Sequence, residues 1–435
     1  MSLIPSPSIS EIRCAFDEAQ TIYPTISGLS SRMLLVPHAG VHESRIVTAA
    51  TLMYLSKTSG DIILLGTNHR NIQLPTPLTF ITNNTADHSL EINSSFLSYM
   101  NKPYNMALLQ SEADPNVVAE SLANWLAQNP TNILIVSSDL SHYHNNQEQD
   151  NINETPLIQS LIQGNYSQTD NSWKSVNACG YLVLQVVSRI ANILKWTGEV
   201  TCYSDSRGKR LGWSTINGDT AVSYLGMIWT DNDINVLSAY DQQLLVAYAK
   251  SCIISGLLLA PPPILPLWSK WYNFNNGAFV GIKDTHSNGT TRASIGNYQS
   301  PNKTIVDNIR NAAFGTIEDA ADRWKQPLNI KEIDLYLFYV NILQDKDQWE
   351  THRPIDLLGH ISSQSNYGFY LVIGNLRATF LPSVWSDMAD SWSYSDLMTK
   401  LTIKAGGQGS EWRNPNAQVQ LYHTSYIELA QYRAC

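Results

Sequence analysis

Cysteine is scarce in this chain, and its spacing excludes two common uses of the residue. The 435 residues include 5 cysteines, an odd number, and no C-x-x-C pair occurs. The cysteines are Cys14, Cys179, Cys202, Cys252 and Cys435. A disulfide framework normally uses an even set of cysteines, and a structural zinc module uses closely spaced pairs. The sequence therefore predicts neither, and this usage is typical of a reducing, cytoplasmic setting.

Long apolar runs are also missing. The most apolar stretch, residues 252–268, contains four prolines and is shorter than the roughly 20 residues that span a bilayer. The N-terminal MSLIPSPSISEIR lacks a basic segment followed by an apolar one, so we expect no signal peptide. The sequence predicts no membrane-spanning segment and no membrane partner.

Positive charge is in short supply as well. Charged residues make up 15% of the chain, and the formal net charge is −9. A protein whose main task is to bind phosphate backbones needs a basic surface. The composition therefore argues against nucleic acid as a partner.

Several catalytic fingerprints are absent. The chain contains no G-x-S-x-G elbow, P-loop, dinucleotide-binding G-x-G-x-x-G or H-E-x-x-H. Their absence weakens an assignment as an α/β-hydrolase, a P-loop NTPase, a nicotinamide enzyme or a zincin.

The patterns that are present predict two domains. Residues 30–230 alternate between apolar strand-like runs and helix-like segments, which predicts an α/β domain with a mainly parallel central sheet flanked by helices. A polar, turn-prone run comes next, and the pattern then changes to mixed β-like and helical pieces. We expect a first domain over residues 1–230 and a smaller α+β domain over residues 238–435.

Three apolar runs in the first domain lead into histidines. Met33–Pro37 precedes His38, Ile62–Gly66 precedes His69, and Ile133–Ser138 precedes Asp139 and His142. In a parallel sheet, the residues just past the carboxyl ends of the strands meet at one crevice. The pattern predicts one shared site at this edge of the sheet.

His38 and His69 are the best candidates for metal ligands, and Cys179 is the third. Cys179 opens a predicted helix, where the helix dipole favours a thiolate. The alternatives are structural: a histidine after a strand is often simply hydrogen-bonded, and a lone cysteine is often a small buried apolar residue.

Asp139 and His142 form a second candidate pair. A carboxylate that orients an imidazole is a common arrangement for a general acid or base. The alternative is that Asp139 caps a turn. In the same way, His88 and Glu91 share a helix face or, with Asp87 as N-cap, merely begin a helix.

Five segments occur in the order seen in the Memo family. They are Val36–Gly40, Leu65–His69, Asp87–Glu91, Ser137–Tyr143 and Ala178–Gly180. Roughly residues 30–230 thus resemble Memo proteins, which are similar in fold to class III extradiol dioxygenases. The resemblance implies a metal pocket with His38, His69 and Cys179 as ligands and with His142 and Asp139 nearby. It also implies iron or copper as the metal.

The second part of the chain, roughly residues 238–430, resembles the AMMECR-type domain. Gly277–Val280, Leu381–Val384 and Lys404–Gly406 are similar to its G-A-F-V, L-P-Q-V and K-A-G segments. Ser294 stands where that family has a cysteine, so we expect no thiol chemistry there. The fusion looks like the AmmeMemoRadiSam system, which implies a radical-SAM protein as a partner.

The sequence supports two hypotheses of function. The first is a metal-dependent enzyme of oxidoreductase type that acts on a small molecule or peptide, with His142 as acid or base and Asp139 behind it. The thiolate makes copper(I) or zinc more suitable than at a two-histidine, one-carboxylate site, so we do not expect extradiol ring cleavage. The second is a non-catalytic scaffold that binds a ligand or peptide and recruits a partner through its second domain.

Overall fold

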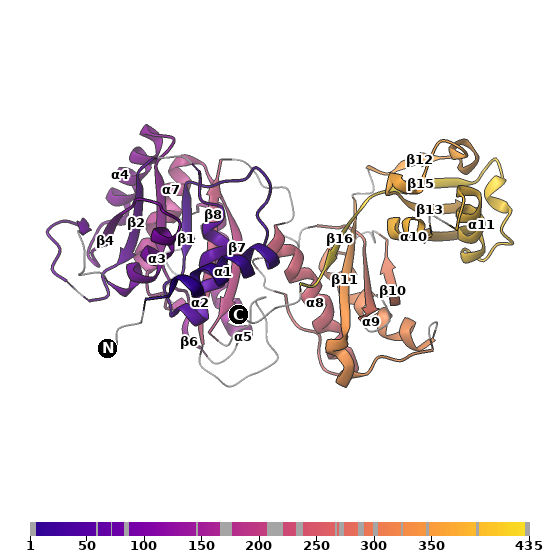
Figure 1. The fold of residues 1–435 in the computed structure, drawn as a ribbon, viewed down its shortest axis with the longest axis horizontal. Coiled ribbons are helices and arrows are strands. Elements are labelled where there is room, and N and C mark those ends of the chain that lie inside the picture. The colour runs from indigo at the N-terminus through magenta and orange to yellow at the C-terminus, as the bar shows by residue number, and fades with distance from the viewer. Residues whose placement is uncertain are drawn as a thin grey trace. The chain divides into compact units, whose positions relative to one another are not determined.

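The computed structural model describes most of the chain and divides it into two compact units (Figure 1). The described residues are 6–57, 60–70, 72–81, 87–144, 147–165, 176–206, 221–231, 238–265, 268, 274–285, 291–298, 303–322, 325–344, 348–388 and 391–430. Unit 1 comprises Met1–Leu244, Pro263–Ser269 and Ala430–Cys435, and unit 2 comprises Leu245–Pro262 and Lys270–Leu429. The predicted boundary run is residues 230–237, of which only Thr230 and Asp231 lie within the described residues.

An 8-stranded mixed sheet forms the centre of unit 1, in the order β3-β4-β2-β5-β1-β8-β6, with β7 also paired to β8. The strands are β1 (Met33–Val36), β2 (Ile62–Thr67), β3 (Leu78–Ile81), β4 (Asn105–Leu109), β5 (Ile133–Ser137), β6 (His142–His144), β7 (Thr197–Asp205) and β8 (Ala221–Thr230). Neighbours among β4, β2, β5 and β1 pair in parallel, and the outer strands add to them antiparallel. The central runs are almost uniformly apolar because helices bury both of their faces.

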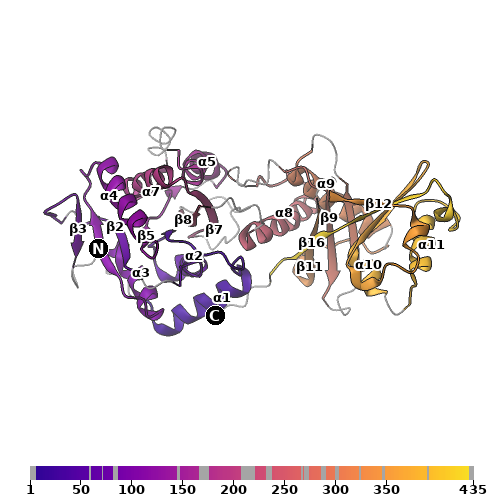
Figure 2. The same ribbon diagram turned by 90° about the horizontal axis from the view of Figure 1, so that it is seen from above.

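Helices cover the two faces of this sheet (Figure 2). They are α1 (Ile9–Ile22), α2 (Val41–Leu52), α3 (His88–Tyr99), α4 (Pro115–Gln128), α5 (Gln147–Gln163) and α7 (Tyr181–Leu194). The first three lie on one face, and α4, α5 and α7 lie on the other. The predicted α/β architecture, with mainly parallel strands flanked by helices, is confirmed.

Unit 2 contains two antiparallel sheets of 4 strands each. One has the order β10-β9-β11-β16 and the other β12-β15-β13-β14. The strands are β9 (Ala278–Asp284), β10 (Thr291–Asn297), β11 (Tyr336–Leu343), β12 (Glu350–His352), β13 (Gly368–Ile373), β14 (Leu376–Phe380), β15 (Gln418–Tyr422) and β16 (Thr424–Glu428).

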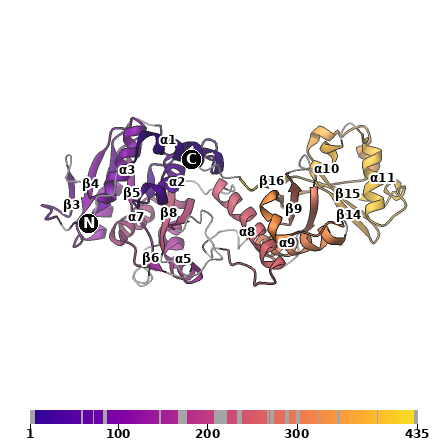
Figure 3. The ribbon, with the colours of Figure 1, turned by 60° about the horizontal axis from the view of Figure 1, so that its bottom comes forward.

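The helices of unit 2 are α8 (Ala239–Leu257), which begins within unit 1, α9 (Ile305–Asp322), α10 (Pro382–Asp387) and α11 (Tyr394–Lys404). Short 3-10 turns occur at Ile330–Leu335, Pro354–Leu357, Ser363–Ser365 and Glu411–Arg413. α9 packs on β9 and β10, and α11 lies against the second sheet at β14 (Figure 3). Phe369, Trp385 and Trp412 are buried in the core between that sheet and its helices. The predicted smaller, sheet-rich α+β domain is confirmed.

Two sequence expectations concern the chain as a whole. No helix within the described residues is long and apolar enough to cross a membrane. Cys14 is disulfide-bonded, whereas Cys179, Cys202 and Cys252 carry free thiols. The cysteine spacing did not predict this bond because a disulfide depends on proximity in the fold, which spacing alone does not reveal.

A glycine in β8 lets α2 pack directly on the sheet. A Cβ atom at Gly226 would lie 2.0 Å from Thr51 Oγ1 and 2.8 Å from Thr201 Oγ1. These two hydroxyl oxygens are 2.7 Å apart and hydrogen-bond to each other across the buried helix–sheet interface. A Cβ atom at this position therefore fits only if the Thr51 side chain moves and its hydrogen bond with Thr201 is disturbed.

We therefore expect Gly226→Ala to lower the free energy of unfolding of unit 1 by about 1–3 kcal/mol, the usual cost of overpacking a core. Denaturant melts would measure the change. Thr51→Ala removes the nearest oxygen, so Gly226→Ala should cost less in that background. Equal costs in the two backgrounds would contradict this explanation.

Candidate metal centre

The parallel strands bring two predicted histidines together. β1 ends at Val36, two residues before His38, and β2 ends at Thr67, two residues before His69. Both strands pair in parallel with β5, so their carboxyl ends lie at the same edge. The two imidazole rings are 5.2 Å apart between centroids and nearly perpendicular.

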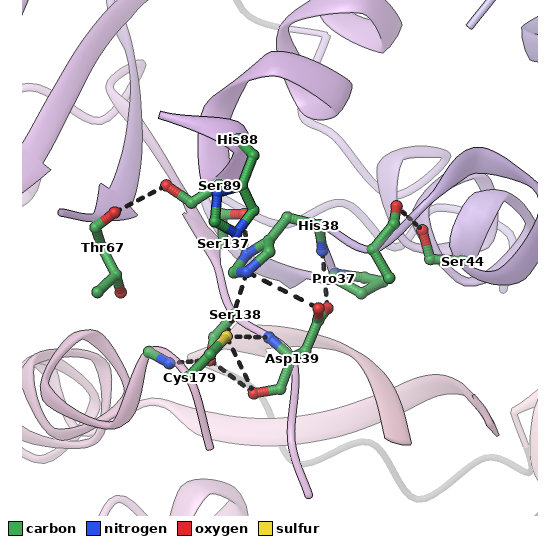
Figure 4. A network of polar contacts seen from close by, with 12 residues as sticks. Pro37, His38, Ser44, Thr67, His88, Ser89, Ser137, Ser138, Asp139 and Cys179 are labelled. Carbon is green, nitrogen blue, oxygen red and sulfur yellow. Dashed lines mark hydrogen bonds and ion pairs between the residues drawn. The ribbon is translucent and has the colours of Figure 1, made fainter. Parts of the chain in front are cut away.

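Cys179 reaches the same edge from the turn before α7. Its Sγ lies 3.1 Å from Nε2 of His38, and the two side chains point toward each other in Figure 4. One ligand atom from each of His38, His69 and Cys179 falls within 4.8 Å of the other two. Gly180 permits this approach, since a Cβ there would lie 2.6 Å from Ser138 Oγ.

His38 is a buried imidazole held by hydrogen bonds. Its Nδ1 lies 3.1 Å from Ser137 Oγ, at the end of β5. Burial lowers the pKa of His38 to about 4, against the opposing effect of Asp139. The ring is therefore neutral at physiological pH, which is the form that binds metals.

His69 presents a free nitrogen to the site. Its Nδ1 lies 3.1 Å from both Asp87 Oδ1 and the carbonyl oxygen of Thr67. Both of these partners are acceptors, so Nδ1 carries a proton and the lone pair sits on Nε2. That Nε2 is buried and has no hydrogen-bond partner among the described residues. A histidine that donates one nitrogen to a carboxylate and leaves the other free is the usual metal-binding arrangement.

Cys179 is half-buried. Burial, together with the charge of Asp139, raises its pKa. The backbone N–H of Asp139 donates to Sγ over 3.3 Å. The protein alone thus holds a thiol here, and a thiolate requires a nearby positive charge such as a metal ion. The donor set of two imidazoles and one sulfur fits such an ion.

Asp139 and His142 also lie at this edge, and one potential ligand atom from each of Asp139, His142 and Cys179 falls within 4.8 Å of the other two. Asp139 Oδ1 accepts the backbone N–H of His38 over 2.8 Å, and Oδ2 lies 3.7 Å from His38 Nε2. The Nδ1 of His142 lies 2.7 Å from the carbonyl of Leu140 and 3.2 Å from that of Asn177. Two carbonyl groups thus contact Nδ1 of His142, and the Asp139 carboxylate also contacts His38 at the end of the neighbouring strand.

Asp87 has a larger role than its sequence position indicated. It caps α3 by accepting the N–H of Ser89, and it also accepts the N–H of Arg70. The same carboxylate contacts Nδ1 of His69 and lies 3.3 Å from Nδ1 of His88. The Asp-His-Ser segment signalled a helix start, and the histidine contact arises only in the folded chain.

A second group of potential ligands, His69, Asp87 and His88, overlaps the first. Asp87 there already accepts several hydrogen bonds, and His69 uses Nδ1 to donate to it. His38, His69 and Cys179 form the better set because the Nε2 of His69 has no partner among the described residues and the Nε2 of His38 faces the Cys179 sulfur.

A variant of Asp87 tests the orientation of His69. Burial lowers the pKa of His69, but the hydrogen bond and charge of Asp87 outweigh burial and raise it overall. We expect Asp87→Asn to lower the pKa of His69 because the carboxylate that stabilises the imidazolium is lost. NMR titration of the metal-free protein would measure it. Glu91→Gln is the matched control. Glu91 lies on α3, the helix that Asp87 caps, and its carboxylate pairs with Arg70 at 3.7 Å. An unchanged or higher His69 pKa in Asp87→Asn would contradict the assignment.

Comparison with known proteins places both parts of the chain. Residues 77–228 match the family described as Memo-like protein, and residues 246–427 match the AMMECR1 family. No curated protein matches the chain significantly. A solved structure, an uncharacterised protein PH0010 from Pyrococcus horikoshii, is 20% identical and has a TM-score of 0.38. That match covers 43% of this chain and 90% of the other. The chain is a fusion of a Memo-like domain and an AMMECR1 domain.

Proposed function

We propose that the Memo-like domain binds a metal ion through Nε2 of His38, Nε2 of His69 and Sγ of Cys179. The observation that carries this proposal is the buried, unpartnered Nε2 of His69 beside a cysteine and a second, neutral histidine. A buried polar atom without a partner is costly and calls for an explanation. A shared cation would satisfy this nitrogen and stabilise the Cys179 thiolate at the same time.

Iron or copper, which the resemblance to Memo proteins implies, is the proposed metal, with zinc as the third choice. Two imidazoles and one thiolate form a softer set than the two-histidine, one-carboxylate triad, which shifts the preference toward copper(I) and zinc. When bound, the ion supplies Lewis acidity and, for iron or copper, electron transfer.

We infer an oxidoreductase-type pocket for a small molecule or peptide. His38 is buried, whereas the side chain of His69 remains 20% exposed, so a ligand can approach from the His69 side. His142 would exchange a proton with this ligand through Nε2, since its Nδ1 is held by the Leu140 carbonyl. Asp139 would hold the His38 backbone and the Cys179 sulfur in place. A radical-SAM protein is the proposed partner.

Metal analysis tests the ligand set. We expect the protein, purified without chelator and reconstituted, to bind one ion per chain. His38→Ala, His69→Ala and Cys179→Ser should each weaken binding by more than about 100-fold, since outer contacts alone change affinity by about 10–100-fold. Titration with Fe(II), Cu(I) and Zn(II) would measure this. The control is His423→Ala, because His423 lies on Tyr367 in the AMMECR1 domain. Wild-type binding no tighter than that of the three variants would refute the proposal.

A second candidate function is a non-catalytic scaffold. Ser294 lies where the AMMECR1 family has a cysteine, and its backbone N–H donates to Asp319 Oδ2 over 3.0 Å. Cys252, the one cysteine among the described residues of unit 2, is fully buried in α8. The AMMECR1 domain would then recruit a partner while the pocket recognises a ligand.

Capture of a radical-SAM partner distinguishes the two functions. We expect the wild-type chain to retain the partner and a triple variant without His38, His69 and Cys179 side chains to retain less of it. An enzyme that works with its partner on one ligand needs the assembled pocket, whereas a scaffold does not. Equal capture by both chains, measured by pull-down, would favour the scaffold.

A further inference from the structure

The segment from the end of β5 to the start of β6, Ser137–His142, contacts His38 and Cys179 and contains His142. Ser137 contacts the imidazole of His38, and the backbone N–H of Asp139 donates to the sulfur of Cys179. The carbonyl of Leu140 holds the ring of His142. The position of this segment therefore sets the surroundings of two proposed ligands and of the proposed proton carrier.

A buried carboxyl group on α5 hydrogen-bonds to the backbone of this segment. Glu154, on α5, is fully buried, and its Oε1 accepts the backbone N–H of Ser141 over 3.2 Å. Its Oε2 accepts the hydroxyl of Tyr203, on β7, over 2.6 Å. No sequence pattern pointed to this group, because Glu154 lies within a polar helix and far from every motif.

The phenol of Tyr203 reaches a second anchor of the same segment. Its hydroxyl lies 3.1 Å from Ser223 Oγ on β8. The backbone of Ser223 accepts the N–H of Leu140 and donates to the carbonyl of Ser141, over 2.9 Å in each case. One buried tyrosine thus connects the carboxyl group and the strand that together hold residues 140 and 141.

We propose that Glu154 and Tyr203 are positioning residues for the metal centre: through Ser141 and Ser223 they hold the segment that contacts His38, Cys179 and His142. This inference rests on the proposed metal-binding function. Neither residue faces the ligand atoms, so their effect passes through the backbone of residues 139–142.

Burial makes these contacts sensitive to substitution. Tyr203 is 2% exposed, and burial raises the pKa of both Tyr203 and Glu154. Removing the phenol hydroxyl takes the Tyr203 donor from Glu154 Oε2 in a buried site, and we expect the carboxyl group to shift toward its remaining donors. Such a shift acts first on the Ser141 N–H, one residue from His142.

Co(II) titration of the full chain tests the inference, with visible absorption as the readout. The d–d and thiolate charge-transfer bands of Co(II) report the geometry around the ion, which a loss of stability alone does not move. We expect Tyr203→Phe and Glu154→Leu to shift these bands and to weaken Co(II) binding by about 10-fold or more, as outer contacts do in metal sites. Glu154→Gln keeps an acceptor for Ser141 and should restore most of the affinity.

Tyr54→Phe is the matched control. Tyr54 is a buried tyrosine whose hydroxyl accepts the N–H of Ile26, and its backbone carbonyl accepts the N–H of Ser31 before β1. It therefore lies at the opposite end of the sheet from the site. The control should lower thermal stability and leave the Co(II) spectrum unchanged.

The outcomes separate the two proposals. If the wild-type chain binds Co(II) and Tyr203→Phe binds it with the same bands and affinity, the positioning role alone is overturned. Equal spectral changes in Tyr203→Phe and Tyr54→Phe also overturn it. A wild-type chain that binds no Co(II), Fe(II), Cu(I) or Zn(II) overturns the metal-binding function and this inference with it. If Glu154→Leu fails to fold, Tyr203→Phe still decides the question.

Discussion

Parallel pairing of β1, β2 and β5 is the constraint on which the candidate site depends. It brings three strand ends to one edge and places Val36 beside Ser137 in register. His38 and His69 come within two residues of these ends, so little chain is left to vary their positions. The helices that bury both faces hold the strands in this order. The pairing of the strands thus sets the positions of the two imidazoles relative to each other.

Exclusion of water gives this edge its chemistry. His38 is neutral because it is buried, and Cys179 keeps its proton for the same reason. Several polar groups around them are paired, including Asp139 with the His38 backbone and Asp87 with His69. The Nε2 of His69 has no hydrogen-bond partner among the described residues, and neither do Thr67 Oγ1, Asn93 Oδ1 and Ser141 Oγ. His38, His69 and Cys179 could together hold a cation, and burial makes an isolated thiolate nucleophile costly at this edge.

The sequence predicted the site residues that follow directly from strand ends. It did not predict contacts between residues far apart in the chain. Apolar runs identified the strands, and the position just after a strand end was enough to bring His38 and His69 together. Their use as metal ligands remains a prediction. The contact between Asp139 and His38 joins residues 101 apart in the chain, and no local pattern encodes it. The role of Glu154 was not predicted for the same reason, since its partners come from β7 and from the segment that follows β5. The role of Gly226 was not predicted either, because Thr51 and Thr201 come close to it only in the folded chain.

The carboxylate of Asp87 joins two tasks that proteins usually keep apart. It starts α3 by accepting the Ser89 N–H, and it fixes which nitrogen of His69 faces the pocket. Asparagine or serine could replace it as a helix cap, but neither would supply a charge to the imidazole. A descendant of this chain that carries asparagine or serine at position 87 would therefore keep the start of α3 and lose the charge beside His69. The helix start tolerates more substitutions at this position than the imidazole does.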